Sequence, residues 1–151
     1  MIIGLVCALV IIGIDQLTKF IVFGTASRSI IGNFLWFEST LNTGVAFSMF
    51  EGKSLLFFII AMVASVVIIY FICSKKMLKF ISEKLALGLI LGGTISNAID
   101  RLIIGGVRDF IYLKFMNFAI FNIADMAITI GAILLCVSII FLREKEKDDR
   151  A

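Results

Sequence analysis

"SLLFFIIAMVASVVIIYFIC", residues 54–73, is an unbroken run of apolar and small residues without a single charged side chain. A bilayer hydrocarbon core is crossed by about 20 residues of α-helix, so this run has the length of one membrane span. The whole chain is 61% hydrophobic and 17% charged, with a mean hydropathy of +1.12. Soluble domains are about half apolar and about a quarter charged. The sequence therefore predicts a membrane protein.

Three further apolar runs, at about 1–23, 85–104 and 122–142, are also long enough to span the bilayer. The first has no basic N-terminal region, and its apolar stretch is too long for the hydrophobic core of a cleaved signal peptide. We interpret it as the first helix. The prediction is an all-α membrane protein, a four-transmembrane-helix bundle forming a single domain over residues 1–151.

Lysine and arginine indicate the orientation of this bundle. The segment 74–84 and the tail 143–151 carry four basic residues each, whereas the other two connections carry two each. Basic residues concentrate on the cytoplasmic side, so both termini should be cytoplasmic. The net charge of +3 reflects this bias, and we expect no nucleic-acid partner.

The main outer loop is expected at 25–53. Its β-branched and aromatic residues are separated by glycine and asparagine, which predicts short strands and turns. Trp36 and the phenylalanines around it suit the headgroup layer. We expect a small sheet-like platform lying on the membrane.

Histidine is absent from the sequence, and the three cysteines are scattered singly. Ser-His-Asp and Cys-His triads and His-ligated zinc sites are thereby excluded. We expect neither a metal nor a cofactor. Any catalysis must use carboxylates, lysine or hydroxyl groups.

Three acids, Asp15, Asp100 and Asp125, lie inside or at the edge of predicted spans. An aspartate at the centre of a span costs about 2.5 to 3.5 kcal/mol, so such residues are functional candidates. At about 1.5 Å per residue, Asp15 lies about 21 Å along its helix and Asp100 about 22 Å. With Asp109, just past the third span, these acids gather near the outer face, and the inner half of the bundle should contain none.

Spacing assigns partners to some of these acids. Asp15 and Lys19 are four residues apart, the favourable order for an ion pair on a helix, and a structural salt bridge is the favoured interpretation. Asn97 lies one turn from both Asp100 and Arg101. We expect an amide, an acid and a guanidinium in one hydrogen-bonded cluster, with Asp100 largely neutralised.

Asp109 and Asp125 have no cation three or four residues away. Arg108 adjoins Asp109, but neighbours in an extended segment point to opposite sides. Two such carboxylates brought together share a proton, as in aspartic proteases. One would take a proton from attacking water while the other donates to a peptide carbonyl. A helix cap or an ion pair explains each acid singly just as well.

Four segments together resemble the signature regions of the lipoprotein signal peptidase (signal peptidase II) family. They are "DQLTK" at 15–19, "NTGVAF" at 42–47, "GGTISNAIDRLIIGGVRDFI" at 92–111 and "FNIADMAITIG" at 121–131. They occur in the family order on a chain of the family length. The "VxDF" and "FNxAD" patterns are the specific part of this resemblance.

The resemblance implies an aspartic endopeptidase that removes the signal peptide from diacylglyceryl-modified prolipoproteins, cutting just before the lipidated cysteine. Its catalytic pair would be Asp109 and Asp125. The substrate-binding and supporting residues would be Asn42, Gly44, Asn97, Arg101, Asn122, Asp15, Lys19 and Asp100. The family fold adds a small extracytoplasmic β-cradle to the bundle.

The resemblance also implies a place and partners. The chain would lie in the bacterial cytoplasmic membrane with its active site near the outer leaflet, in contact with membrane lipid. We expect a monomer that is inhibited by globomycin-type cyclic peptides. The sequence departs from the family pattern at Ser96, where glycine is usual, at Val45, where alanine is common, and at Arg108, where an apolar residue is usual.

Two other functions remain open from the residues alone. A small four-helix channel or proton-coupled carrier could use Asp15, Asp100 and Asp125 as a relay. A Ser-Lys peptidase could pair Lys19 with Ser39 or Ser48, but it needs a neutral lysine, which Asp15 disfavours.

Overall fold

The computed structural model of the protein describes residues 1–44, 52–74 and 78–142. Within these ranges, four helices are long and apolar enough to cross a membrane, which confirms the predicted bundle. They are α1 (Ile2–Val22), α2 (Ser54–Cys73), α3 (Ile81–Ile104) and α4 (Ile123–Val137), the last extended by the π-helical turn η3 (Ser138–Leu142). Val45, Ser48, the tail 143–151 and two of the lysines after α2 lie outside the described residues.

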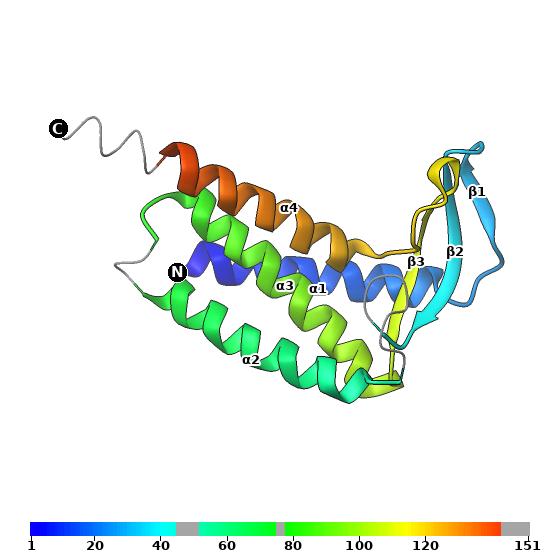
Figure 1. Ribbon diagram of the computed structural model, residues 1–151, viewed down its shortest axis with the longest axis horizontal. Coiled ribbons are helices and arrows are strands. Elements are labelled where there is room, and N and C mark those ends of the chain that lie inside the picture. Colours follow the sequence, from blue (N-terminus) through cyan, green and yellow to red (C-terminus); the bar gives the residue numbers. More distant parts are fainter. Residues whose placement is uncertain (45–51, 75–77, 143–151) are drawn as a thin grey trace.

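A small antiparallel sheet caps one end of the bundle, and the start of α1 and the end of η3 lie at the other end (Figure 1). Its strands, in the order β1-β2-β3, are β1 (Arg28–Ile31), β2 (Leu35–Asn42) and β3 (Val107–Leu113). The first two confirm the strands predicted in the outer loop. The third follows α3, and its pairing with β2 places Asn42 opposite Val107 and Thr40 opposite Asp109.

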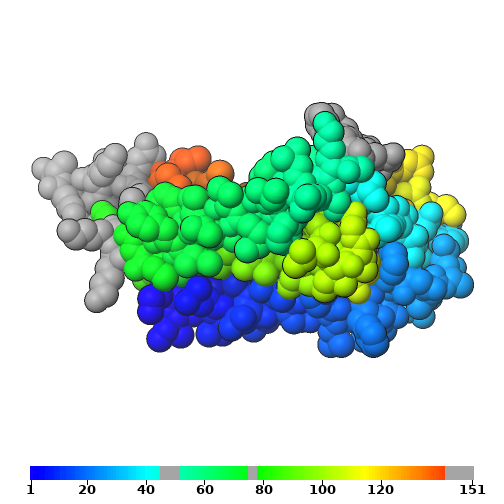
Figure 2. Space-filling model, turned by 90° about the horizontal axis from the view of Figure 1, so that it is seen from below, coloured from blue at the N-terminus to red at the C-terminus, as the bar shows by residue number. Residues whose placement is uncertain are grey.

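Helix α3 is the central helix, because α1, α2 and α4 all pack against it. Small residues allow these close approaches, as is common between membrane helices. A Cβ atom built on Gly92 would lie only 2.7 Å from the carbonyl oxygen of Ala8 in α1, and one on Gly131 of α4 only 2.7 Å from that of Ala86. Seen from another side, the last turns of α3 emerge between α1 and α2 (Figure 2).

A substitution at Gly93 of α3 would test this packing. A Cβ atom there would meet the Ala124 carbonyl oxygen and lie 2.7 Å from the side chain of Ile128. Gly93→Ala should lower the melting temperature in detergent by several degrees, since overpacking costs about 1 to 3 kcal/mol. Gly13→Ala is the matched control on α1, where no described atom beyond the adjacent residues and the helix's own backbone lies within 4 Å of the added carbon. It should keep or raise the melting temperature, because alanine is the better helix former. Equal melting temperatures would contradict the close packing.

One prediction about the acids is wrong. Helix α3 begins at Ile81, before the predicted start at 85, and it carries Glu83 fully buried at the end opposite the sheet. The Glu83 carboxylate accepts the backbone N–H groups of Lys79 at 2.7 Å and Phe80 at 3.2 Å. It satisfies donors that a helix start leaves free, which is why a charged residue is stable there. The half of the bundle away from the sheet therefore does contain an acid.

Candidate active site

Lys19 lies at the centre of a buried polar cluster where α1, α3 and α4 meet the sheet. Its ammonium group is 2.7 Å from Asp15 Oδ2 and 3.1 Å from Asp100 Oδ2, and it donates to Asn97 Oδ1 at 2.9 Å. The side chains of Lys19 and both acids are fully buried. The predicted Asp15–Lys19 ion pair is confirmed. Ser96, one of the departures from the family pattern, donates to Asp15 Oδ2 at 2.7 Å.

Asp100 has other partners than the sequence predicted. Its carboxylate binds Lys19 of α1 and Arg108 of β3, whose Nη2 lies at 2.6 Å. Arg101 instead donates to the carbonyl oxygens of Asn97 at 3.4 Å and Gly44 at 3.3 Å. Adjacent residues on a helix point about 100° apart, so one guanidinium and its neighbouring acid face different sides. The predicted side-chain cluster of Asn97, Asp100 and Arg101 is therefore wrong, since Arg101 binds Asn97 only at its backbone. Asp100 is neutralised, as predicted, but by Lys19 and Arg108.

Asn122 connects the two acids that lack a nearby cation in the sequence. Its side-chain Nδ2 donates to Asp109 Oδ1 at 2.6 Å, and its backbone N–H donates to Asp125 Oδ2 at 3.1 Å. Asn42 donates to the second oxygen of Asp109 at 3.1 Å, and Asn97 to that of Asp125 at 2.8 Å. Each carboxylate thus accepts two hydrogen bonds from uncharged amide groups.

Local sequence explains why α4 begins at this place. Asn122 is the N-cap residue of α4, and its Oδ1 accepts the backbone N–H of Asp125 at 2.9 Å, while the Asp125 carboxylate accepts the N–H of Asn122. This reciprocal pair is a capping box. The start of α4 is also tied to α1, because the Ala124 N–H donates to Asp15 Oδ1 at 2.9 Å. The "FNIAD" segment therefore fixes the helix start and one acid together.

Asp109 lies in a setting that favours its protonated form. Its residue is 3% exposed, and burial raises its pKa to about 7, with a further upward contribution from the charge of Asp125. The hydrogen bonds from Asn42 and Asn122 and the charge of Lys19 act in the opposite direction. Near neutral pH, Asp109 is thus poised between its acid and carboxylate forms.

The raised pKa of Asp109 predicts a pH-dependent stability. An unfolded aspartate releases its proton near pH 4, whereas the folded protein holds this proton to about pH 7. The stability from this group is therefore full below about pH 4 and is lost as pH rises through 7. Relative to Asp109→Asn, the wild-type melting temperature should fall between pH 5 and pH 8. Parallel pH profiles of the two proteins would contradict the raised pKa.

A cavity of about 760 Å³ opens beside these acids. Asp109, Asp125, Asn42, Asn97 and Arg101 line its polar part. Most of the remaining wall is apolar and comes from α2, α4 and the segment before α4, including Ala61, Met116, Phe118, Phe121, Met126 and Ile130. The site thus joins two carboxylates to a hollow suited to apolar groups.

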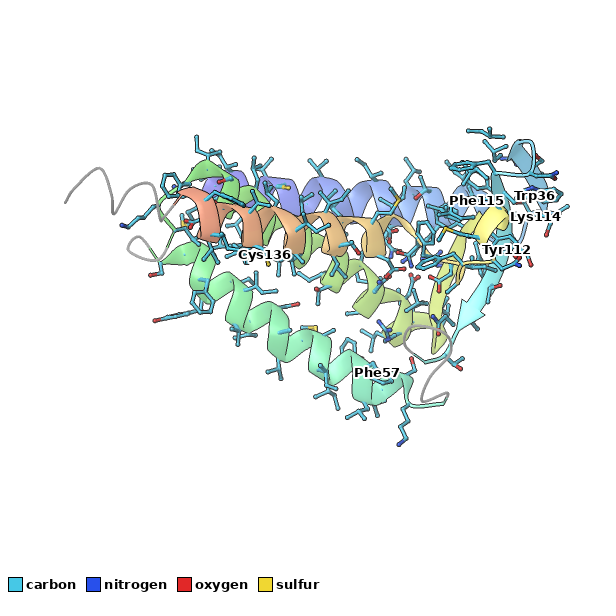
Figure 3. All side chains as sticks on the ribbon, turned by 45° about the horizontal axis from the view of Figure 1, so that its top comes forward. Trp36, Phe57, Tyr112, Lys114, Phe115 and Cys136 are labelled. Carbon is cyan, nitrogen blue, oxygen red and sulfur yellow. The ribbon has the colours of Figure 1, made fainter. Side chains whose placement is uncertain are left out.

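Aromatic residues gather at the sheet end of the molecule. Figure 3 shows Trp36, Tyr112, Lys114 and Phe115 together on the sheet end of the molecule. The Lys114 ammonium lies 3.9 Å from the centroid of the Trp36 ring. Such amphipathic groups are typical of the membrane interface. Phe57, also labelled in Figure 3, lies near the end of α2 that is closer to the sheet. The Arg101 guanidinium is 5.8 Å from the centroid of its ring.

The structure brings all ten predicted site residues into one connected region. Gly44 takes part through its carbonyl oxygen, and the others through their side chains. Sequence reasoning missed Gln16, which donates to Asp100 Oδ1 at 3.1 Å and accepts from Arg108 at 2.7 Å. Only its place beside Asp15 hinted at this role. In the described part of the chain, no group of three or more metal-binding side chains is found.

The Ser-Lys arrangement gains no support from these contacts. Lys19 is held by two carboxylates. The Ser39 hydroxyl contacts the backbone of Gly24 at 3.0 Å and of Val22 at 3.4 Å instead.

Comparisons with known proteins agree with one another. A family model described as Signal peptidase (SPase) II matches residues 7–141. Proteins named lipoprotein signal peptidase from Lactobacillus johnsonii and Shouchella clausii are 40% and 41% identical over 146 residues, covering 94% of this chain and 94% and 95% of theirs. Two solved structures of bacterial membrane enzymes, each 33% identical, superpose with TM-scores of 0.82 and 0.80. They cover 95% and 91% of this chain, and 90% and 92% of theirs.

Proposed function

This chain belongs to the signal peptidase II family, and we propose that it removes signal peptides from prolipoproteins with Asp109 and Asp125 as an aspartic catalytic pair. The main support for this proposal is the position of the two carboxylates. Both carboxylates line the same cavity and are joined through Asn122. In the described residues, neither carboxylate forms an ion pair. The hydrogen-bond partners described above are uncharged amides, so among them no cation locks either acid in its ionised form, and both can exchange protons.

The reaction follows from one shared proton. Asp125, as carboxylate, takes a proton from water while the water oxygen bonds to the scissile carbonyl carbon, and Asp109 donates its proton to the carbonyl oxygen. The tetrahedral intermediate then collapses: the C–N bond breaks as the proton on Asp125 passes to the leaving amine, and the carbonyl re-forms as its hydroxyl returns a proton to Asp109. The pair ends with one proton on Asp109, as it began. The pKa of Asp109, about 7, suits the proton donor at neutral pH.

The remaining site residues have supporting roles in this proposal. Asn42, Asn97 and Asn122 orient the acids through the hydrogen bonds described above. Arg101 faces the cavity, where it adds a positive charge opposite the pair. Asp15, Lys19 and Asp100 would hold the helices in place, and Gly44 would hold Arg101.

The substrate is a prolipoprotein, and we propose that its diacylglyceryl group enters the apolar part of the cavity. Burial of acyl chains contributes about 0.8 kcal/mol per CH₂, so lipid partitioning would deliver the scissile bond to the acids. The cavity is built within one chain, which supports action as a monomer. Globomycin-type cyclic peptides would inhibit by occupying this cavity.

The chain is a multi-pass membrane protein, and we propose that its termini are cytoplasmic and its sheet extracytoplasmic. The exposed Ser27 precedes β1, and the exposed Lys79 lies at the opposite end, before α3. On a cysteine-free background, a membrane-impermeant thiol reagent applied outside the cell should label Ser27→Cys but not Lys79→Cys. Labelling of position 79 alone would reverse the orientation.

Cleavage of a purified precursor tests the function directly. The protein in detergent or liposomes should release the signal peptide from a diacylglyceryl prolipoprotein and leave the same precursor without lipid intact. Mass spectrometry should place the new N-terminus at the lipidated cysteine. A channel or carrier would cut neither precursor, and its acids would need to be free; in this structure Asp15 and Asp100 are held by Lys19.

A further inference from the structure

Arg108 of β3 contacts one residue of α3 and one of α1. Its guanidinium donates to Asp100 Oδ1 through Nη2 at 2.6 Å and through Nε at 3.2 Å. Its backbone N–H donates to Asp100 Oδ2 at 3.0 Å, and Nη2 also donates to Gln16 Oε1 at 2.7 Å. Strand β3 thus carries Asp109 on its cavity side and is attached to α3 and α1 through the preceding residue.

The charges around Lys19 explain why such a residue is needed. Lys19 is a single cation in contact with two fully buried carboxylates, those of Asp15 and Asp100. One cation cannot neutralise two acids, and an uncompensated buried charge is costly. Arg108 supplies the second cation, since its Nη2 is 2.6 Å from Asp100. The supporting part of the cluster therefore has no net charge.

The sum of charges in the site also indicates how many protons the catalytic pair holds. Among the described residues that form the site, the remaining cation is Arg101, which interacts electrostatically with Asp125 and Asp109. With Arg108 present, the whole cluster is neutral when Asp109 and Asp125 together carry one negative charge. That is the state in which the pair holds one proton.

We propose that Arg108 is a positioning residue that sets the proton count of the catalytic pair by neutralising Asp100, while its contacts hold the start of β3 in place. The inference rests on the proposed function of that pair. An uncharged residue at 108 adds one net negative charge near the pair, which should then hold its proton to higher pH. Removal of the Asp100 charge should do the opposite.

The groups that face Asp109 support this direction. They are Lys19 from α1, Arg101 from α3 and Asp125 from α4, with the uncharged Asn42 from β2. The Arg108 side chain points away to Asp100, so its substitution changes the field at Asp109 without removing one of its hydrogen bonds. Asp100 of α3 contacts the Arg108 side chain, whereas Asp109 points from the other side of β3 to Asn122, which puts the two carboxylates on the order of 10 Å apart. One unit charge at that distance shifts a titration by about half a pH unit to one unit.

Four proteins test the proposal: the wild type, Arg108→Met, Asp100→Asn and the double variant. The pH at which cleavage falls to half on the acid side should rise by about half a unit to one unit in Arg108→Met. It should fall by a similar amount in Asp100→Asn and return close to the wild-type value in the double variant. Shifts in the same direction, or no shift, would overturn the proposal, because a purely structural role predicts no opposite signs.

Arg108→Lys separates charge from geometry. Lysine keeps the positive charge but cannot form the planar fork that binds Asp100 through two nitrogens. This variant should keep the wild-type pH profile while its melting temperature falls by a few degrees. A pH profile like that of Arg108→Met would show that the fork, and not the charge, controls the pair, and would also overturn the proposal.

The proton can be followed without turnover. The infrared band of the protonated carboxyl group that disappears in Asp109→Asn should be titrated in the wild type, Arg108→Met and Asp100→Asn. Its midpoint should move up in the first variant and down in the second. If these midpoints move as expected while no prolipoprotein is cut, the proposed function fails and the role of Arg108 stands. If cleavage is normal and the midpoints stay fixed, the role of Arg108 fails alone.

Discussion

Asp109→Asn and Asp125→Asn should each insert into the membrane, bind lipidated precursor and fail to cut it. Asparagine can neither accept the proton of water nor supply one to the leaving amine, and loss of general acid or base action costs about 10² to 10⁴ in rate. The two acids are joined through Asn122, and in the proposed mechanism they share one proton. The double variant should therefore be scarcely slower than either single variant.

The comparison needs a folded control with an equally buried acid. Asp100→Asn removes a carboxylate that binds Lys19 and Arg108 but does not line the cavity. It should lose thermal stability and keep measurable turnover. Cleavage of a diacylglyceryl prolipoprotein, precursor binding and melting temperature should be recorded for all four proteins. An active Asp109→Asn beside an inactive but folded Asp100→Asn would assign the pair to the wrong acid.

Lys19→Met should have the largest effect on stability. The Lys19 ammonium contacts Asp15 and Asp100, and all three side chains are fully buried. Loss of one partner from a buried ion pair costs about 3 to 5 kcal/mol, because the remaining charge has no compensation. We expect little folded protein in detergent, measured by size-exclusion chromatography and thermal unfolding.

A double variant distinguishes unpaired charge from lost packing. Asp15→Asn combined with Lys19→Met removes one of the two carboxylates that the single variant leaves without this cation, and Arg108 still binds the other. The double variant should therefore be more stable than Lys19→Met alone. If it is less stable, the lysine acts mainly through the packing of its methylene groups.

The features predicted correctly from the sequence are those that depend on local patterns. Continuous apolar runs predicted all four spans, and for α1, α2 and α4 the predicted ends lie within one helical turn of the observed ones. The four-residue spacing of Asp15 and Lys19 predicted their ion pair, and the alternation of side chains in a strand predicted that Arg108 and Asp109 point apart.

The two errors have different causes. Asp100 was assigned to its neighbour Arg101, whereas its partners come from α1 and from β3, which the sequence did not identify as a strand of the sheet. The burial of Glu83 was missed because charged residues near an apolar run resemble a loop, although its carboxylate binds the backbone at the helix start. The Asp100 partners do not follow from spacing along one helix, whereas the Glu83 partners lie three and four residues before it, the spacing of a helix cap.

Asn122 holds Asp109 with its side chain and Asp125 with its backbone. One residue therefore bridges the two carboxylates directly, so their spacing depends less on the relative tilt of whole helices than it would without this bridge. Membrane helices change their tilt as bilayer thickness varies. We therefore expect the distance between the two carboxylates to change less than the tilt of the helices when the protein is moved between thin and thick bilayers.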